Sequence, residues 1–381
     1  MSLTSVIEGA GVAVMGLAVC GAVYASLATW ATARFLGRRA SPLTDHPSVC
    51  VLKPLHGDEP ELYENLASFC TQDYPGSVRI ILGAQDPADP ALEIARRVRR
   101  DHPDRDIVLV GDPTTHGTNR KIGNLINMAA QASGEVIVIS DSDVRLPQGG
   151  LSEIVAALQS PGVGLVYCLY RGRPTRTLWS RLSAMDVNTR FAPSVVVGQA
   201  VGAHPCLGPT MALRAELLDQ IGALQHLADF LADDFELGRA VRAAGKRIAC
   251  PPLLIDHVFP DCTAREMLSH DLRWARTIRL VEPWGYLGSA IIHFVPLALI
   301  GAALTGFAGW SLALFAGLTL LRQVQAMALS RMLSADQGLL WLVPLRDALS
   351  FGVFLAAIVG DRVEWRGNHL RVGRDGAIAA T

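Results

Sequence analysis

Charged residues are scarce in this chain. Asp, Glu, Lys and Arg make up 18% of its 381 residues, hydrophobic residues make up 50%, and the mean hydropathy is +0.29. This composition is too apolar for an ordinary soluble enzyme. The formal net charge is −1. The chain therefore lacks the general positive field of many nucleic-acid-binding proteins, and we expect no nucleic-acid partner.

Paired cysteines are missing as well. The chain has 7 cysteines, an odd number, and none forms a Cys-x-x-Cys motif. A zinc site and a secreted disulfide framework are therefore disfavoured. Reduced thiols in a cytoplasmic domain fit the pattern better.

An uncharged stretch near the beginning of the chain predicts a membrane anchor. Residues 9–33 carry no charge, which is enough to cross the hydrocarbon core as one helix. Arg34, Arg38 and Arg39 follow at once, so the positive-inside rule places the leader outside and the following chain in the cytoplasm. A cleaved signal peptide is the alternative, but such a peptide has a basic leader and a shorter apolar core.

A second apolar region predicts further membrane helices. Residues 283–321 are long enough for two crossings joined by a turn near 306–309. The stretch 338–360 leaves two interpretations open, because Arg346-Asp347 lies in its middle. These charges would be costly against lipid and must face protein or water if the segment is buried. The basic tail, with Arg362, Arg366, Arg371 and Arg374, favours the cytoplasm.

The segment between the apolar regions alternates short β-type runs with helical stretches. Strands are expected at 48–52, 78–84, 107–110 and 135–140, with helices at 60–70, 89–100 and 121–132, then strands at 163–169 and 207–213. This alternation predicts an α/β domain whose mostly parallel sheet is covered by helices on both faces. We expect an anchor at 1–40, a cytoplasmic domain at 41–282, and membrane helices with a basic tail at 283–381.

Acidic residues follow the strands of this expected sheet. Asp86 comes after the second strand, and Asp141 and Asp143 come after the fourth. Ligands of such sheets bind at the carboxyl ends of the strands, and hard divalent cations prefer carboxylate oxygens. Asp233-Asp234 opens a helix that Gly245 ends in the left-handed position. The helix N-terminus should hold a carboxylate there ionised, as a general base requires.

A capping box, Thr-Ala-Arg-Glu at 263–266, begins another expected helix that runs to about residue 280. This helix leads directly into the second apolar region, so we expect it at the bilayer surface. Each motif alone has an ordinary explanation: Asp86 in a turn, Asp233-Asp234 as a cap, or Arg273-Trp274 as an interfacial pair. The order of the motifs carries more information than any one of them.

As an ordered set, the motifs resemble the inverting, membrane-bound ceramide glucosyltransferase family and its bacterial relatives. The matching segments are Leu-Lys-Pro-Leu at 52–55, Asp-Tyr-Pro at 73–75, Gln85-Asp86, Asn-Arg-Lys-Ile-Gly-Asn-Leu at 119–125, Asp-Ser-Asp at 141–143, Ala-Asp-Asp at 232–234, Arg273-Trp274 and Trp-Arg-Gly at 365–367. The resemblance implies a GT-A nucleotide-sugar-binding domain between membrane helices and a Mg²⁺ or Mn²⁺ cofactor.

Three segments resemble the hopanoid-biosynthesis branch of these enzymes: 168–174, 231–234 and 270–279. That branch implies transfer of N-acetylglucosamine from UDP-GlcNAc to the polyol of bacteriohopanetetrol, an amphiphilic lipid acceptor, at the bacterial inner membrane. The family motif usually has Gln or Arg three residues before its arginine, where this chain has His270. This departure disfavours a ceramide acceptor and agrees with the hopanoid branch.

The resemblance also implies a role for each matching side chain. Asp86, Lys121 and Asp141 would bind the donor, Asp143 and Asp141 the metal, and Asp234, Arg273, Trp274 and His270 would form the catalytic group. Asp234 would take the proton from the acceptor hydroxyl in a single displacement that inverts the sugar.

Three other functions are weighed against this one. A ceramide glucosyltransferase using UDP-glucose belongs to the same class, and a lipid-acceptor assay separates the two. A processive polysaccharide synthase is disfavoured because few membrane helices remain to line a polymer channel. A membrane protein that only binds a nucleotide sugar would not need every carboxylate expected for both the metal and the base.

Overall fold

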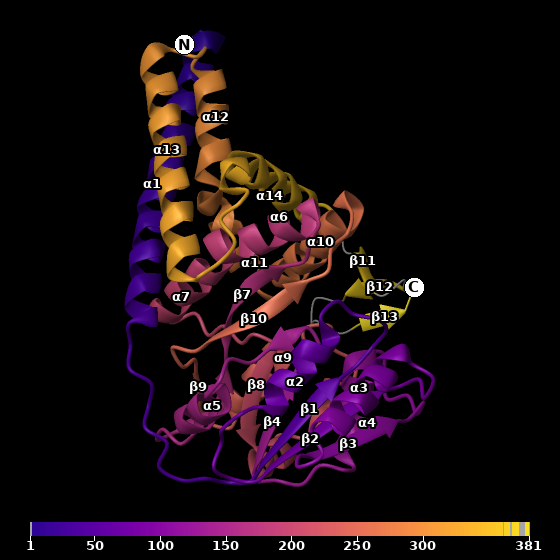
Figure 1. Cartoon of the computed structure of the whole chain (residues 1–381). Coiled ribbons are helices and arrows are strands. Elements are labelled where there is room, and N and C mark those ends of the chain that lie inside the picture. The colour runs from indigo at the N-terminus through magenta and orange to yellow at the C-terminus, as the bar shows by residue number, and fades with distance from the viewer. Residues whose placement is uncertain (1, 361, 366–367, 373–377, 381) are drawn as a thin grey trace.

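The computed structural model divides into an elongated group of helices and an α/β body beneath it (Figure 1). It describes residues 2–360, 362–365, 368–372 and 378–380. Arg366, Gly367 and Arg374, named above, lie outside these residues. The predicted division of the chain at 40/41 and 282/283 remains a prediction.

The body is built on a seven-stranded sheet in the order β3-β2-β1-β4-β8-β6-β9. The strands β1, β2, β3 and β4 are parallel, whereas β8 is antiparallel to β4 and β6. The strands are β1 (Val49–Pro54), β2 (Val78–Ala84), β3 (Asp106–Gly111), β4 (Val136–Ser140), β6 (Val163–Tyr167), β8 (Thr210–Arg214) and β9 (Arg247–Ala249). The expected α/β fold with a mostly parallel sheet is confirmed.

Helices connect these strands, and four of them lie at the predicted places: α2 (Leu62–Cys70), α3 (Pro90–Asp101), α4 (Arg120–Ala129) and α9 (Asp233–Ala243). Two more, α5 (Gly150–Leu158) and α8 (Ala215–Gln220), were not predicted. Local chemistry fixes their ends. Asp89 caps α3 before a proline at its first position, and Asn119 caps α4. Gly245 follows α9 with φ +73°, a conformation that glycine adopts without strain.

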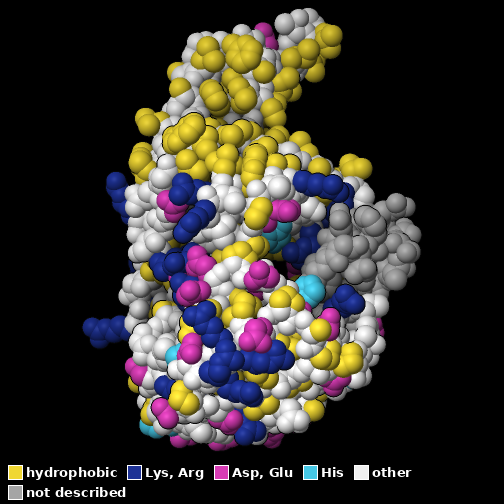
Figure 2. All heavy atoms as spheres, turned by 45° about the vertical axis from the view of Figure 1, so that its right-hand side comes forward, with side chains coloured by type: hydrophobic (Ala, Val, Ile, Leu, Met, Phe, Trp, Pro, Cys, Tyr) yellow, Lys and Arg dark blue, Asp and Glu magenta, His cyan; other side chains and the backbone are white. Residues whose placement is uncertain are grey.

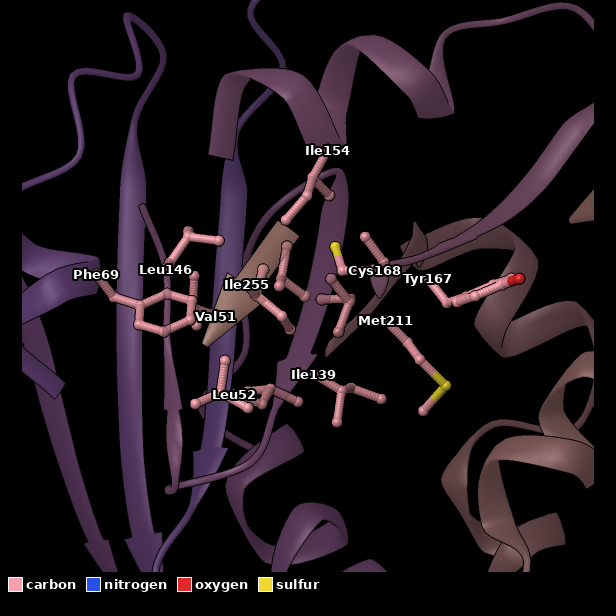
Figure 3. Close-up of a cluster of buried hydrophobic side chains, with 14 of the residues drawn as sticks. Val51, Leu52, Phe69, Ile139, Leu146, Ile154, Tyr167, Cys168, Met211 and Ile255 are labelled. Atoms are coloured by element: carbon pink, nitrogen blue, oxygen red, sulfur yellow. The ribbon is translucent and has the colours of Figure 1, made fainter. Parts of the chain in front are cut away.

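The hydrophobic core of the α/β body lies between this sheet and the elements that pack against it. Every residue of β1 and β4 is buried, as expected of strands covered on both faces. Figure 3 shows Val51, Leu52 and Ile139 packed with Met211 of β8 and with Ile255, which comes from a second sheet.

That second sheet corrects one prediction. The apolar run at 163–169 is not one strand: β6 ends at Tyr167, and β7 (Leu169–Pro174) joins a three-stranded sheet with β5 (Val144–Arg145) and β10 (Leu254–Phe259). Residues 164–169 of this run are all buried. The continuous hydrophobic pattern therefore contained no sign of the change of sheet at Cys168.

Within the part of the chain that the structure describes, four helical segments are long and apolar enough to cross a membrane: 3–36, 283–304, 309–332 and 340–358. They comprise α1 (Leu3–Leu36), α11 and α12 (Pro283–Gly288 and Phe294–Leu304), α13 (Gly309–Met332) and α14 (Val343–Ile358). Glycines let α1 approach the second span closely, since a Cβ at Gly21 would lie 2.0 Å from the Ile291 carbonyl oxygen. The expected turn near 306–309 is present.

The surface of these helices is that of a membrane protein. Figure 2 shows hydrophobic side chains covering the upper part of the molecule, with Lys and Arg gathered below them. Leu17, Leu27, Trp310 and Leu320 are among the exposed side chains on α1 and α13. A monomeric soluble protein rarely exposes so continuous an apolar surface.

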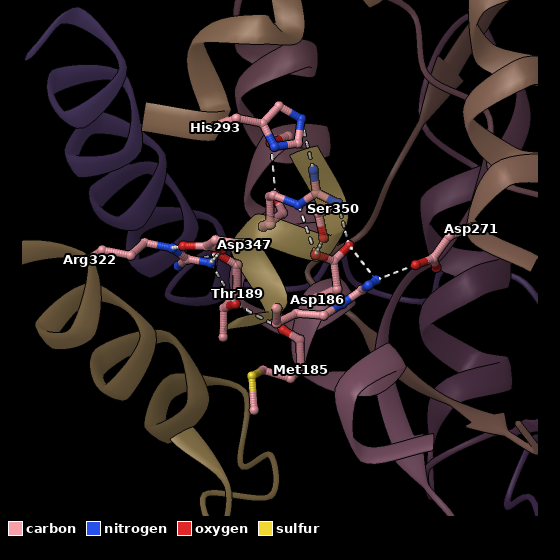
Figure 4. Close-up of polar contacts among 11 residues, drawn as sticks. Met185, Asp186, Thr189, Asp271, His293, Arg322, Asp347 and Ser350 are labelled. Carbon is pink, nitrogen blue, oxygen red and sulfur yellow. Dashed lines mark hydrogen bonds and ion pairs between the residues drawn. The ribbon is translucent and has the colours of Figure 1, made fainter. Parts of the chain in front are cut away.

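The charges in the middle of α14 are buried against protein. Arg346 and Asp347 are 2% and 5% exposed. Asp347 pairs with Arg322 of α13, while Arg346 lies 2.7 Å from Asp271 (Figure 4). In Figure 1, α14 lies across the foot of α12 and above α10 (Ala264–Val281) instead of running alongside α13. The two charges thus avoid lipid by ion-pairing with other helices.

Candidate active site

The Asp-Ser-Asp turn, residues 141–143, follows β4, and a buried lysine forms hydrogen bonds with its backbone. Lys53 of β1 is 0% exposed, and its Nζ donates to the carbonyl oxygens of Asp141 at 2.6 Å and Val144 at 3.3 Å. Burial lowers the pKa of Lys53 to about 7, although the charge of Asp143 opposes the shift. Lys53 therefore fixes the backbone of the turn and leaves both aspartate side chains free for other contacts.

Lys121 joins this turn to the beginning of α9. Its Nζ lies 2.9 Å from Asp141 Oδ1 and 3.4 Å from Asp233 Oδ2. Burial alone would lower the pKa of Lys121, but these two carboxylates outweigh it and raise the pKa. The lysine is thus held as a cation between two acidic segments that are far apart in the sequence.

Hydrogen bonds between two loops place Lys121 there. The side chain of Asn119 donates to the Phe230 carbonyl at 2.7 Å, and the backbone N–H of Thr118 donates to Asp229 Oδ1 at 2.9 Å. Gly117 has φ +66°, and a Cβ there would lie 2.5 Å from a backbone oxygen of the facing loop. Only glycine allows this approach, so the loop before α4 and the loop before α9 form one unit.

Asp234 faces the same junction from the first turn of α9. Its carboxylate accepts the N–H groups of Gly208 and Phe235, both at 2.8 Å. We expected the helix N-terminus to hold this group ionised, and the two N–H donors do lower its pKa. Burial first and the neighbouring charge of Asp233 second act against them and raise the pKa of Asp234 to about 6. A pKa near neutrality suits a general base.

Asp143 turns toward the second sheet. Its Oδ2 accepts a hydrogen bond from His257 Nε2 of β10 at 2.9 Å. Burial would raise the pKa of Asp143, but the charge and hydrogen bond of His257 outweigh it, so the pKa is lowered. The other oxygen, Oδ1, is buried without a hydrogen-bond partner among the described residues. Asp143 is therefore anchored by one oxygen only.

The helix α10 brings its polar and aromatic residues to the side of the second sheet. The His270 and Trp274 rings are 4.7 Å apart, and Trp274 also contacts Phe259 and Phe191 at 6.3 and 5.8 Å. His270 Nδ1 lies 3.6 Å from Asp261 Oδ1. Arg273, of the same helix, is partly buried. The expected capping box of α10 is present.

Asp86 stands at the carboxyl end of β2, where its exposed side chain accepts the Ala88 N–H at 2.8 Å. β1 lies between β2 and β4, so Asp86 follows a strand that is two positions away from the one that Asp141 follows. The structure thus brings Lys121 into contact with Asp141 and Asp233, places Asp234 next to Asp233, and leaves Asp86 farther along the same edge of the sheet.

Comparison with known proteins identifies the family to which the chain belongs. Residues 13–378 match the model of Glycosyl transferase family 21. The chain belongs to that family. It is accordingly an enzyme, a glycosyltransferase.

Relatives of this family 21 enzyme match half or more of its length at low identity. Ceramide glucosyltransferase 1 of Caenorhabditis elegans is 24% identical over 361 residues, 90% of this chain and 75% of the relative. Beta-monoglucosyldiacylglycerol synthase of Synechocystis is 26% identical over 196 residues, 50% of this chain and 40% of the synthase. A mannosyltransferase of Pyrobaculum calidifontis, solved with GDP-Man and Mn²⁺, has a TM-score of 0.56 at 20% identity, covering 93% and 99% of the two chains. That likeness concerns the fold.

The residues of the family 21 site fit a divalent cation that shares its coordination with a substrate. Among the described residues, no group of three or more His, Cys, Asp or Glu is placed to hold a metal. Asp143 nevertheless has an unpartnered buried oxygen, and Asp141 gives only one oxygen to Lys121. Mg²⁺ is typically held by one or two carboxylates together with substrate phosphates and water. These aspartates supply that number of ligands.

The sequence analysis did not single out two residues that contact the Asp-Ser-Asp turn, Lys53 and His257. Lys53 stood in a matching motif, and a lysine inside a fully apolar strand was a usable sign of a buried role. His257 lies in the run Leu-Ile-Asp-His-Val-Phe of β10. Its two adjacent polar residues lie between apolar pairs, and nothing in this pattern named Asp143 as the partner.

Proposed function

We propose that this family 21 enzyme transfers N-acetylglucosamine from UDP-GlcNAc to the polyol head of a hopanoid lipid such as bacteriohopanetetrol. The reaction takes place at the bacterial inner membrane, with the catalytic domain in the cytoplasm. The observation that carries the sugar-transfer chemistry of this proposal is the contact of Lys121 with both Asp141 and Asp233. This contact joins the side of the site that would hold the donor to the helix that carries the base. The donor sugar and the hopanoid acceptor rest on the sequence resemblance of residues 168–174, 231–234 and 270–279.

Asp86 holds the uridine part of the donor, and the diphosphate lies about two strand spacings away, by the Asp-Ser-Asp turn. Lys121 and Arg273 face its negative charge. Asp143 and Asp141 would hold Mg²⁺ or Mn²⁺, with Asp143 as the more direct ligand because its Oδ1 has no hydrogen-bond partner among the described residues. Such a cation offsets the charge that develops on the leaving UDP.

Asp234 removes the proton from the attacking hydroxyl of the acceptor. The new bond forms between that oxygen and the anomeric carbon while the bond to the diphosphate breaks, and the proton remains on the Asp234 carboxylate. A single displacement of this kind inverts the sugar configuration without a covalent enzyme intermediate. The pKa of about 6 lets Asp234 be ionised at neutral pH and still accept a proton.

The acceptor reaches the site from the membrane, since the helix α10 carries His270 and Trp274 and continues directly into the second membrane span. Trp274 packs against the acceptor or the sugar ring. A lipid acceptor stays in the bilayer, so only its polar head needs to enter the site. We place α10 at the bilayer surface for this reason.

A ceramide acceptor with UDP-glucose is the second candidate, because relatives spanning most of the chain are ceramide glucosyltransferases. The purified enzyme is to be incubated with labelled UDP-GlcNAc or UDP-glucose and with bacteriohopanetetrol or ceramide, and the lipids analysed by mass spectrometry. We expect N-acetylhexosaminyl bacteriohopanetetrol. Formation of glucosylceramide alone would reject the hopanoid acceptor and leave the glycosyltransferase assignment intact.

Removal of divalent cations should lower transfer more than tenfold. EDTA would take away the cation that stabilises the leaving UDP, a contribution on the order of several kcal/mol. UDP release is the measurement, and excess Mn²⁺ or Mg²⁺ added after EDTA should restore it, whereas excess Ca²⁺ serves as the control for simple charge screening. Undiminished transfer in EDTA would show that the reaction does not need a divalent cation.

A further inference from the structure

His257 touches the Asp-Ser-Asp turn but has no part in the mechanism above. Its imidazole is 8% exposed and lies 2.9 Å from Asp143 Oδ2. A second hydrogen bond joins the same two segments through the backbone: the N–H of Val258 donates to the Asp143 carbonyl oxygen at 2.9 Å. Two hydrogen bonds from adjacent residues of β10 therefore hold Asp143, one on its side chain and one on its main chain.

Packing holds the imidazole in this orientation. The Tyr170 ring meets it edge-on at 5.1 Å and 90°, and the Phe259 ring lies 4.8 Å away. The Nδ1 atom is buried and has no hydrogen-bond partner among the described residues. Burying an unsatisfied polar atom costs free energy that a phenyl or leucine side chain would avoid. The contact through Nε2 is therefore what distinguishes histidine from an apolar residue at this position.

This contact leaves Asp143 with one usable oxygen. Oδ2 is occupied by His257, while Oδ1 is buried without a partner in the described part of the chain. A carboxylate that is pinned through one oxygen presents the other in a fixed direction. Mg²⁺ demands near-ideal octahedral geometry, so a ligand that points one way favours its binding.

We propose that His257 is a positioning residue that aims Asp143 Oδ1 at the divalent cation. The inference rests on the proposed function, in which Asp143 is a cation ligand. Residues that orient a metal ligand in this way typically change metal affinity by about 10- to 100-fold when they are replaced. His257 is thus expected to act on cation binding before any chemistry takes place.

Mn²⁺ binding to the full-length enzyme in detergent, with UDP present, tests this directly. Free Mn²⁺ is measured by electron paramagnetic resonance during a titration. We expect His257→Leu to weaken binding by about 10- to 100-fold. His257→Gln should stay near the wild type, because its amide can still donate to Asp143. On an Asp143→Ala background, His257→Leu should cause no further loss. Wild-type affinity in His257→Leu overturns the inference.

Phe259→Leu is the matched control, since it removes a ring that packs 4.8 Å from the imidazole and keeps the hydrogen bond to Asp143. An equal loss of Mn²⁺ affinity in Phe259→Leu would mark a packing effect and overturn the inference. A nitrogen coupling of directly bound imidazole in the pulsed spectrum would make His257 a ligand instead. If the wild-type enzyme binds no Mn²⁺ with UDP, the metal role in the proposed function fails together with this inference. If wild type and His257→Leu bind it equally, only the inference fails.

Discussion

Replacing Asp234 with asparagine should lower the rate of sugar transfer by about 10²- to 10⁴-fold, the usual contribution of a general base. An amide has nearly the same shape, and its carbonyl oxygen can still accept one of the two N–H groups, that of Gly208 or that of Phe235, so the beginning of α9 should stay in place. It does not take up a proton. Single-turnover transfer and UDP-sugar binding, measured on the same preparation, separate the chemical step from donor affinity.

Donor affinity in Asp234→Asn should remain close to that of the wild type, and Asp219→Asn on the exposed face of α8 should alter neither quantity. The wild-type pH profile gives an independent test. Because burial raises the pKa of Asp234 to about 6, kcat/KM should fall as the pH drops through about 6 and the carboxylate becomes protonated. The kcat/KM of the remaining activity in Asp234→Asn should not fall in this way as the pH drops. Normal transfer by this variant would remove Asp234 from the mechanism.

Much of the body could be predicted from local patterns because its signals lie close together in the sequence. The buried runs of β1, β2 and β4 are bounded by turn residues, and the capping box of α10 marks that helix within four residues. The position of Asp141 at the end of β4 follows from the same periodicity. Such features can be recognised from a residue and its sequence neighbours alone.

The contacts that complete the site could not be predicted in this way. His257 and Asp143 are 114 residues apart, and Asn119 and Phe230 are 111 residues apart. A residue leaves no periodic trace of a partner so distant in the chain. The raised pKa of Asp234 has the same origin, because it depends on burial, which only the assembled fold creates. The sequence indicated candidate groups for the site without Lys53 and His257, whereas the fold determines which groups meet.

Asp347→Ala should destabilise the protein by about 3–5 kcal/mol, because it would leave the Arg322 guanidinium buried without its counter-ion. The pair is made of two parallel hydrogen bonds, both at 2.9 Å, between α13 and α14. Each side chain is 7% exposed. Arg322 also donates to the backbone oxygen and hydroxyl of Thr189, at 3.1 Å in both cases. Thr189 lies in the π-helical turn Val187–Phe191, so the pair links two membrane-region helices to the body.

Unfolding in detergent micelles, followed by helix content, measures this loss. Asp106→Ala is the matched control: its partner Arg79 lies 2.7 Å away, but the two side chains are 50% and 36% exposed. An exposed pair of that kind contributes about 0–1 kcal/mol. The double variant Arg322→Met, Asp347→Leu should recover most of the stability, because replacing both ions with apolar side chains removes the uncompensated charge. A loss in Asp347→Ala no larger than in Asp106→Ala would show that water or lipid headgroups reach Arg322. The charges of α14 would then not depend on protein partners.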